Sequence, residues 1–502
     1  MNSIRVLRVC PNIKEGLGHN LRPFIDSMCR TGIKQKVLSL GIDFDSRAPF
    51  SAFRAGFEAA KKINLTDYDL IHVHNPSFWG LLMKARGKVK TIVTFHGSFY
   101  YTLKHFYVGD IKQNLYYLFN GLLSLMFADK VIFINKKDEW FFSHFTKKCF
   151  FIPPGYDQTI FKGNSSVERK RQVLFVGRDN PNKNFKAVVS FCEKNKLPLA
   201  AVHGDSKYSP MELAKLYRES KYLALFSYSE GFGKVLLEGV ACGCVPVLTK
   251  TTHENMRELG ISFLAPDGFD ERAPVGICSN LENVKTCTWE SVSRKTFHLY
   301  RMMFGSFFYP GQKVLVVEPH NDDAMLSLGG IILSNPKVDF TILSIISNNG
   351  FGTKKLSRKF GNVRSVQLNL KGVHNGESEE EFFSRNKLSK EQFVQKLRKF
   401  SLQQDVVLMP FGEFHPMHKL IGRIRFYNSI RYLDLPYGIS KVNIVKLPFR
   451  MRFLRSVRFN VKKFLKRKTD LITQNYGSSV KEFMENGPGR KVKEFDSEVL
   501  FY

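Results

Sequence analysis

Two short segments in the last third of the sequence carry residue types that bind a catalytic metal ion. His320, Asp322 and Asp323 directly follow the apolar run from Leu315 to Val317, which is typical of a buried strand. A second cluster, Phe-Gly-Glu-Phe-His-Pro-Met-His over residues 411–418, adds two more histidines. Imidazole nitrogens and carboxylate oxygens are ligands of catalytic Zn²⁺, which takes about three protein ligands and leaves one position open for water. Because a strand end aims such side chains rigidly, these segments predict a zinc site.

A second group of candidate residues lies in the segment Glu230-Gly-Phe-Gly-Lys-Val-Leu-Leu-Glu238. The two glutamates are separated by a little over two helical turns, so with Glu230 in a loop one carboxylate can face a sugar ring and the other a ribose. The glycines between them let backbone amides approach a diphosphate at the start of a helix. This segment therefore predicts a nucleotide-sugar site.

The elements that would position these residues are visible as short apolar segments that alternate with helical periodicity. This alternation predicts parallel sheets with helices on both faces. A break near Pro153-Pro154-Gly155 precedes a second strand and helix series, so we expect two doubly wound halves with a ligand cleft between them. The expected strands are Ile4 to Val9, Gln35 to Leu40, Leu70 to Val73, Thr91 to Phe95, Val131 to Ile134, Gln172 to Val176, Leu199 to Val202, Leu223 to Phe226 and Val245 to Leu248.

The expected domain boundaries follow from Pro and Gly residues between the predicted elements. A helix from Trp289 to Met303 leads to the segment Tyr309-Pro310-Gly311-Gln312, whose Pro and Gly indicate a linker. We therefore expect a first domain over 1–305, a linker over 306–312 and a second domain over 313–502. Within the first domain, we expect one half over 1–155, a nucleotide-sugar half over 156–288 and a return helix over 289–305.

Composition narrows the partners and the compartment. The 76 Lys and Arg against 45 Asp and Glu give a net charge of +31, which favours an anionic partner: nucleic acid, a membrane surface or a phosphorylated glycan. The eight cysteines show no framework spacing, which favours a reducing compartment. The first residues, with arginines inside an apolar stretch, are typical of a strand rather than a signal peptide. We expect a cytoplasmic protein.

Membrane association, if any, is expected to be peripheral, because no stretch reaches the roughly 18 apolar residues that span a bilayer. The segment Tyr116 to Ile134 divides better into a buried helix and a strand from Lys130. The segment Lys446 to Lys468 carries ten positive charges, no acid and four interleaved phenylalanines. It can lie on the anionic cytoplasmic face of an inner membrane, or form a solvated face with its aromatic residues in a core.

Most of residues 1–305 resemble the family 4 retaining glycosyltransferases of GT-B fold, which have two Rossmann-like halves. Besides the Glu230 to Glu238 segment, the resemblance rests on the glycine loop Gly16-Leu-Gly18, on Thr94-Phe-His96-Gly97, on Ile152-Pro-Pro-Gly155-Tyr-Asp157 and on Val176-Gly177-Arg178 with Lys183. It implies that Arg178 and Lys183 hold the diphosphate, Glu230 contacts the transferred sugar, Glu238 contacts the ribose and His96 lies near the sugar and the acceptor. The implied nucleotide-sugar site is Gly16, Gly18, Arg178, Lys183, Glu230, Gly231, Phe232, Gly233 and Glu238, with no cofactor required.

The two segments of the second domain resemble the motifs of the PIG-L/LmbE family of zinc-dependent N-deacetylases, which implies a further Rossmann-like α/β domain. The resemblance implies His320, Asp323 and His418 as zinc ligands, Asp322 as general base and His415 facing the developing oxyanion. Two positions depart from the family pattern: Ala324 stands where a Glu is usual, and Met417 stands where an Asp would orient the histidine.

Together the two resemblances imply a bifunctional enzyme. It would transfer N-acetylglucosamine from UDP-GlcNAc to a lipopolysaccharide core or a related surface glycolipid, with retention, and then remove the acetyl group. Two alternatives stay open: a small soluble acceptor of the thiol-cofactor type, or an active transferase with a degenerate, glycan-binding second domain. Nucleic-acid binding fits the charge, but no recognised binding motif accompanies it, so we expect no nucleic-acid partner.

Overall fold

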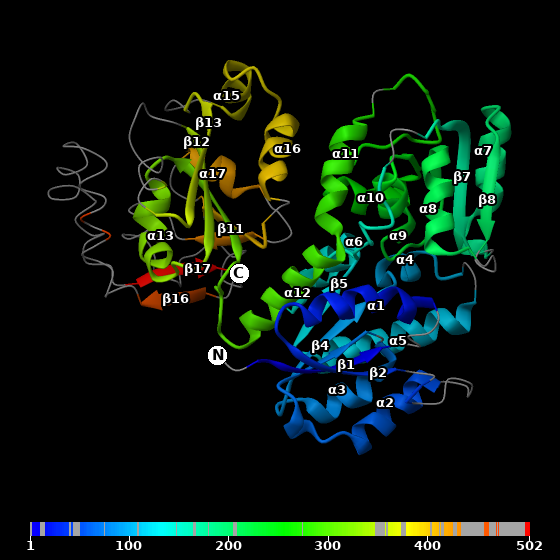
Figure 1. Cartoon of the computed structure of the whole chain (residues 1–502), viewed down its shortest axis with the longest axis horizontal. Helices are drawn as coiled ribbons and strands as arrows, with labels where there is room; N and C mark the ends of the chain where they lie inside the picture. The colour runs from blue at the N-terminus through cyan, green and yellow to red at the C-terminus, as the bar shows by residue number, and fades with distance from the viewer. Residues whose placement is uncertain are drawn as a thin grey trace. The chain divides into compact units, whose positions relative to one another are not determined.

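A computed structural model describes residues 3–10, 16–39, 42–43, 51–74, 76–107, 110–146, 148–163, 167–178, 180–203, 208–273, 275–346, 357, 360–372, 378–401, 404–410, 412, 416–424, 429–432, 456–460, 468, 470 and 497–501. The chain forms two compact units, Met1–Met303 and Phe304–Tyr502 (Figure 1).

The first unit begins with a six-stranded parallel sheet in the order β2-β1-β3-β4-β5-β6. A second, four-stranded parallel sheet has the order β10-β9-β7-β8. The strands of the first sheet are β1 (Arg5–Cys10), β2 (Lys34–Ser39), β3 (Leu70–Val73), β4 (Lys90–Phe95), β5 (Lys130–Phe133) and β6 (Cys149–Phe151), and those of the second are β7 (Lys170–Gly177), β8 (Leu199–His203), β9 (Ser220–Leu225) and β10 (Val245–Leu248).

Helices cover both faces of the first sheet, as the alternating pattern predicts. One core packs α1 (Gly16–Cys29) and α12 (Trp289–Met303) against the sheet through Phe24 and Leu299. The opposite core contains residues of α2 (Ser51–Lys62), α3 (Trp79–Ala85) and α5 (Ile111–Phe127). Helix α12 is thus the last helix of the first unit, after the strands of the second sheet, but it packs on the first sheet. The remaining helices of this unit are η1 (Leu65–Asp67), η2 (Pro76–Phe78), α4 (Phe99–Lys104), α6 (Lys136–Ser143), η3 (Pro181–Lys183), α7 (Phe185–Lys194), α8 (Pro210–Glu219), α9 (Lys234–Ala241), α10 (Lys250–Glu258), α11 (Ile277–Val284) and η4 (Lys285–Cys287).

The second unit has one seven-stranded sheet in the order β13-β12-β11-β14-β15-β17-β16, parallel from β13 to β15 and antiparallel at β17 and β16. Two hydrophobic cores lie on its two faces: one contains α13, and the other contains α15, α16 and α17. The elements are β11 (Lys313–His320), α13 (Asp323–Ser334), β12 (Asp339–Ile346), β13 (Val363–Leu370), α15 (Glu379–Arg385), α16 (Lys390–Ser401), β14 (Val406–Pro410), α17 (Pro416–Gly422), β15 (Ser429–Tyr432), β16 (Ser456–Asn460) and β17 (Ser497–Phe501).

All nine strands expected in the first unit are present, and the parallel α/β class is confirmed. Two local predictions were wrong. Gly16 and Gly18 lie in the first turn of α1 rather than in a glycine loop. Helix α5 is not a buried helix, since only one of its faces is buried. Among the described helices, none is long and apolar enough to cross a membrane.

Candidate active sites

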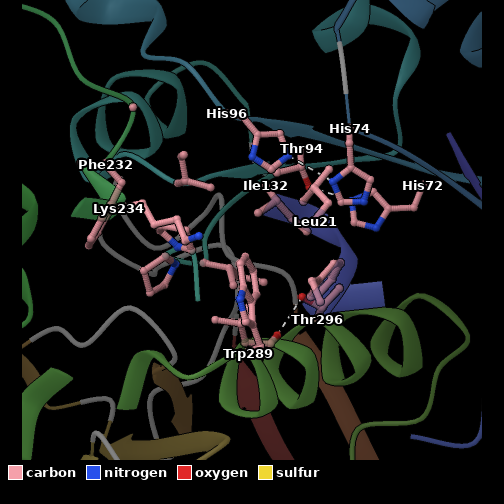
Figure 2. A pocket seen from close by; sticks show the side chains of 18 of the residues that line it. Leu21, His72, His74, Thr94, His96, Ile132, Phe232, Lys234, Trp289 and Thr296 are labelled. Carbon is pink, nitrogen blue, oxygen red and sulfur yellow. Dashed lines mark hydrogen bonds between the residues drawn. The ribbon is translucent and has the colours of Figure 1, made fainter. Parts of the chain in front are cut away.

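A pocket in the first unit lies where the carboxyl ends of the first sheet face the start of α9. Its lining includes His96, which follows β4, the loop Glu230-Gly231-Phe232-Gly233 before α9, and Trp289 at the start of α12. Figure 2 shows the histidines on one side of the pocket and Phe232 and Lys234 on the other. The halves approach closely here, because a Cβ added to Gly231 would overlap the carbonyl oxygen of His96. Only glycine fits at this position.

Glu230 is held by an ion pair and by hydrogen bonds. Its Oε1 lies 2.5 Å from Lys183 Nζ, and the two side chains are only 14% and 16% exposed. Ser227 Oγ donates to the same oxygen at 2.6 Å. Asn135 Nδ2, at the start of α6, donates to the backbone carbonyl of Glu230 at 2.9 Å. The ion pair places a cation beside the pocket, where it can move from the carboxylate to an entering diphosphate.

The other predicted donor-site residues are placed differently. Arg178 follows β7 and is exposed. Glu238 lies on α9, is buried and pairs with Lys234 Nζ at 3.0 Å, while Tyr217 Oη lies 3.4 Å from its other oxygen. Of the predicted set, the pocket lining contains His96, Glu230, Gly231, Phe232 and Gly233, and it does not contain Arg178, Lys183 or Glu238. Gly233 has φ +79° and stands directly before α9, a conformation that favours glycine.

A buried chain of hydrogen bonds that the sequence interpretation missed runs behind His96. Arg8 on β1 is fully buried. Its Nη1 lies 2.7 Å from His74 Nε2 and 3.1 Å from His72 Nδ1, and its Nη2 donates to Tyr300 Oη at 3.1 Å. His74 Nδ1 in turn lies 3.1 Å from His96 Nε2. The hydrogen bonds therefore connect Arg8 on β1 to the pocket wall, which His72 and His74 line together with His96.

Donor chemistry fixes the direction of this chain. A guanidinium can only donate, so His74 Nε2 accepts and the neutral His74 ring carries its proton on Nδ1. That Nδ1–H donates to His96 Nε2, so a neutral His96 carries its proton on Nδ1. By the same reasoning His72 accepts at Nδ1 and donates from Nε2 to Thr94 Oγ1 at 2.7 Å. Neutral His96 therefore offers an N–H donor, which suits a sugar or phosphate oxygen.

Burial keeps these rings neutral. It lowers the pKa of His96 to about 4. Burial, followed by the positive charge of Arg8 and the neighbouring histidines, lowers the pKa of His72 and His74 well below the usual value. A buried histidine that cannot take up a proton destabilises the folded state in acid, because the unfolded chain does take one up.

We expect the first unit to lose stability as the pH falls from 7 to 5. The folded pKa is lowered, so the unfolded state binds more protons below about pH 6.5. For His96, with a folded pKa of about 4, the loss of stability over this window is about 2 kcal/mol, and His72 and His74 act in the same direction. Thermal unfolding can be followed by tryptophan fluorescence, since all three tryptophans belong to this unit. His96→Asn should flatten the pH dependence, whereas His144→Gln, at an exposed position, should not. Equal pH dependence in all three proteins would contradict the assignment.

The sequence does contain a signal for this series of hydrogen bonds. Arg8 interrupts an apolar strand, and His72 and His74 are two positions apart at the end of the next strand in the sheet, so both face the same side. In the parallel pairing Arg8 lies opposite His72. The order of strands in the sheet, which the sequence does not state, was needed to connect them.

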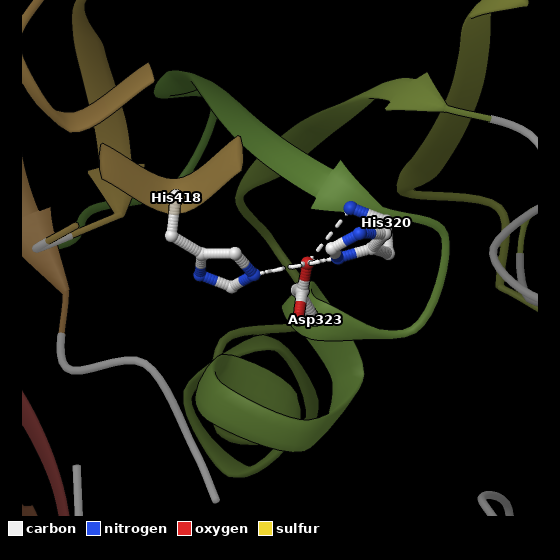
Figure 3. Close-up of side chains that lie close together, drawn as sticks. All are labelled: His320, Asp323 and His418. Atoms are coloured by element: carbon white, nitrogen blue, oxygen red, sulfur yellow. Dashed lines mark hydrogen bonds and ion pairs between the residues drawn. The ribbon is translucent and has the colours of Figure 1, made fainter. Parts of the chain in front are cut away.

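The second unit brings together three of its predicted residues at the ends of neighbouring strands. His320 ends β11, Asp323 begins α13, and His418 lies in the first turn of α17, which follows β14 (Figure 3). Asp323 Oδ2 lies 3.2 Å from both His320 Nδ1 and His418 Nε2, and the two nitrogens are 3.4 Å apart. Tetrahedral Zn²⁺ with ligands at about 2.1 Å needs ligand atoms about 3.4 Å apart. The two nitrogens and one oxygen therefore fit a zinc ion, with a fourth position left for water.

The two adjacent carboxylates are electrostatically different. Burial, then the negative charge of Asp323, raises the pKa of Asp322 to about 6. Although burial opposes it, the charges and hydrogen bonds of His418 and His320 hold the pKa of Asp323 well below its usual value. One carboxylate is thus suited to stay ionised as a ligand, and its neighbour is suited to exchange a proton.

The structure shows the surroundings of Ala324 and Met417, the two positions that depart from the deacetylase pattern. The backbone N–H of Ala324 donates to Glu318 Oε2 at 2.9 Å, and Ser344 Oγ donates to the other oxygen of that buried carboxyl. Met417 is fully buried and belongs to the hydrophobic core beneath α17. His415, the expected oxyanion partner, lies outside the described residues, so the structure does not place it.

The two sheets, the returning helix and the pocket between them are the arrangement that the GT-B resemblance predicts for the first unit. Residues 23–159 match the sequence model of Glycosyltransferase Family 4. This match supports a family 4 type of glycosyltransferase in the first unit.

The curated relatives include an uncharacterized glycosyltransferase of Methanocaldococcus jannaschii, which is 25% identical over 226 residues, or 40% of this chain. The chain spans 60% of the length of that relative. Similar solved structures include a sucrose-phosphate synthase of Thermosynechococcus elongatus (TM-score 0.49, 14% identity, 60% of this chain and 99% of that one). Another is an α,α-trehalose-phosphate synthase (UDP-forming) of Burkholderia vietnamiensis (TM-score 0.42, 14% identity, 60% and 100%).

Proposed function

We propose that this chain is a bifunctional glycan-modifying enzyme. Its first unit transfers N-acetylglucosamine from UDP-GlcNAc, with retention, to a lipopolysaccharide core or a related glycolipid at the cytoplasmic face of the inner membrane. Its second unit is a zinc-dependent deacetylase that exposes the amine of the added sugar. The observation that carries the proposal is the presence on one chain of two candidate sites. One is a pocket lined by Glu230 and His96, with Lys183 paired to Glu230 beside it, and the other is the zinc-compatible group His320, Asp323 and His418.

In the first unit, charge and hydrogen bonding support group transfer. The leaving diphosphate develops negative charge, which Lys183 can neutralise once its ion pair with Glu230 opens. The neutral His96 can donate a hydrogen bond to an oxygen of the sugar or of the acceptor. Glu230 and the backbone of the Gly231 to Gly233 loop would then orient the sugar.

In the second unit, the three ligands would hold Zn²⁺, which polarises an acetamide carbonyl and lowers the pKa of a water when it is bound. Asp322 stands next to the ligand Asp323 and has a raised pKa, so it can take a proton from the attacking water and deliver it to the departing amine. Hydrolysis of the amide then yields acetate and the free amine.

The test uses the full-length protein with UDP-GlcNAc and a lipopolysaccharide that lacks the outer core. Release of UDP reports transfer, release of acetate reports deacetylation, and mass spectrometry of the glycolipid shows whether N-acetylhexosamine or hexosamine has been added. The proposal predicts UDP release before acetate release and a hexosamine product. UDP-glucose as sole effective donor would reject the donor assignment. Transfer only to malate or inositol phosphate would favour the small-acceptor alternative.

The departures at Ala324 and Met417 favour one second candidate: an active transferase whose second unit binds glycans without hydrolysing them. Under that alternative the chain releases UDP but no acetate, and the product keeps its acetyl group even when zinc is bound. Metal content and acetate release, measured on the same preparation, separate the two functions.

A further inference from the structure

The outer face of α5 in the first unit carries a row of large apolar side chains in contact with solvent. They recur at helical spacing, four, four, three and four positions apart, so they form a stripe along one side of the helix. With Phe145, which lies just after α6, they form what we name the α5 surface: Ile111, Leu115, Phe119, Leu122, Met126 and Phe145, exposed by 42%, 55%, 58%, 54%, 51% and 76%.

The inner face of the same helix mixes apolar and small polar residues. Its buried residues are Leu118, which belongs to the hydrophobic core, and Asn120, Gly121 and Ser124. Trp79 Nε1 donates to Asn120 Oδ1 at 3.0 Å, and Ser124 Oγ donates to the backbone carbonyl of Pro76 at 2.5 Å. The apolar residues of the outer face take little part in this packing, since each remains at least 42% exposed. A row of this length on a soluble surface indicates contact with an apolar partner.

The α5 surface continues onto α6. A shallow hollow between the two helices is lined by Leu122 and Met126 on one side and by Phe141 and Phe145 on the other. Trp140 on α6 is half exposed, and Lys137 Nζ lies 4.6 Å from the centre of its indole ring. An exposed tryptophan beside a lysine is the combination found where proteins meet the headgroup region of a bilayer.

Charge identifies the partner. Residues 99–148 contain seven lysines against four acids, and α5 itself contains no acid. Asp138 is buried, and Glu139 and Lys136 neutralise each other in an ion pair at 2.9 Å, which leaves six lysines against Asp110 and Asp129. A second copy of the chain would bring two proteins of net charge +31 together, whereas anionic lipid attracts both the rim of the patch and the whole protein.

We propose that the α5 surface docks the protein on an anionic lipid bilayer. Helix α5 would lie in the plane of the interface over a length of about 25 Å, with its apolar stripe among the acyl chains and the lysines at the headgroups. This differs from the basic segment Lys446 to Lys468, of which only 456–460, a strand of the second unit, and the buried Lys468 are described. Docking of the α5 surface does not depend on the proposed function. Only the identity of the glycolipid acceptor rests on that function.

Vesicle co-sedimentation of the full-length protein tests the proposal. The probes are vesicles of phosphatidylcholine alone and of phosphatidylcholine mixed with phosphatidylglycerol. Wild type should bind the mixed vesicles, less strongly at high salt, and Leu115→Glu/Phe119→Glu should bind them at least about tenfold more weakly because it adds two buried charges to the contact. The matched control Met211→Glu/Ile277→Glu changes exposed apolar residues on α8 and α11 and should bind like wild type.

Equal binding by Leu115→Glu/Phe119→Glu and wild type would overturn the proposal and point to the basic segment. Absence of vesicle binding by wild type would also overturn the proposal. If wild type is a dimer that this double variant dissociates, and neither protein binds vesicles, the α5 surface is an interface between copies.

A second measurement uses fluorescence. Brominated lipid should quench the fluorescence of Trp140, and Trp140→Phe should lose that quenching. Transfer to a detergent-dispersed acceptor should be unchanged in the double variant, so failure of docking and failure of the transferase proposal give different results.

Discussion

Replacing Lys183 by methionine is expected to lower kcat/KM for the proposed donor, UDP-GlcNAc, by about 10²–10³-fold. In the wild type, Lys183 Nζ lies 2.5 Å from Glu230 Oε1. Both side chains are largely shielded from solvent, so the charge of Lys183 is weakly screened. Without the cation, the carboxylate of Glu230 faces the incoming diphosphate with like charge, and the leaving group loses its counter-charge in the transition state. UDP release under steady-state conditions gives the rate, and calorimetric titration gives the affinity for UDP.

The matched control for this change is Lys186→Met, which removes the same charge three positions later at an exposed site on α7. It should keep wild-type kinetics and wild-type affinity for UDP. Thermal unfolding of Lys183→Met shows whether the unit still folds, and Ser227 remains as a hydrogen-bond donor to Glu230 in that variant. Wild-type kcat/KM in Lys183→Met, with the fold intact, would remove this lysine from the diphosphate site.

The second large effect is expected at the zinc-compatible group. Asp322→Asn should lower the rate of acetate release about 10²–10⁴-fold, the usual contribution of a general base, and should leave zinc content unchanged. Asp323→Asn should instead lose the metal, because Asp323 Oδ2 lies 3.2 Å from both His320 and His418 and completes the ligand set. UDP release by the first unit should be the same in both variants.

Asp339→Asn is the control for this pair, since Asp339 is an exposed carboxylate at the start of β12 in the same unit. It should keep both zinc content and acetate release. Equal rates of acetate release in Asp322→Asn and wild type would reject the general-base role. Loss of zinc from Asp322→Asn would show that this residue is a ligand, and stoichiometric zinc in Asp323→Asn would show that Asp323 is not.

The sequence by itself determined nine of the ten described strands of the first unit, all but β6, and the first strand of the second unit, together with the residues at their carboxyl ends. Apolar runs such as Leu70 to Val73 must be buried on both faces of a parallel sheet, so their positions follow from local composition. His320 and Asp323 are close in sequence as well as in space, so a strand followed by a helix is enough to bring them together. For the same reason the Glu230 to Gly233 loop could be placed before a helix.

The tertiary structure decided which distant residues meet. His418 reaches His320 across 98 positions because β14 is the parallel neighbour of β11. Arg8 reaches His74 because β1 and β3 are adjacent in the sheet, although another strand separates them in the chain. Strand order depends on long-range pairing that periodicity does not encode.

The tertiary structure also decided which side of α5 is buried. An apolar, nearly uncharged stretch predicts burial, yet here Asn120, Gly121 and Ser124 are buried against α3, β4 and η2, while Phe119 and Leu122 are exposed. The close approach of the helix to its neighbours requires small residues, and Asn120 and Ser124 find hydrogen-bond partners there, so the larger side chains are left on the outside. Which side of a helix meets the core depends on this packing and not on hydrophobicity alone.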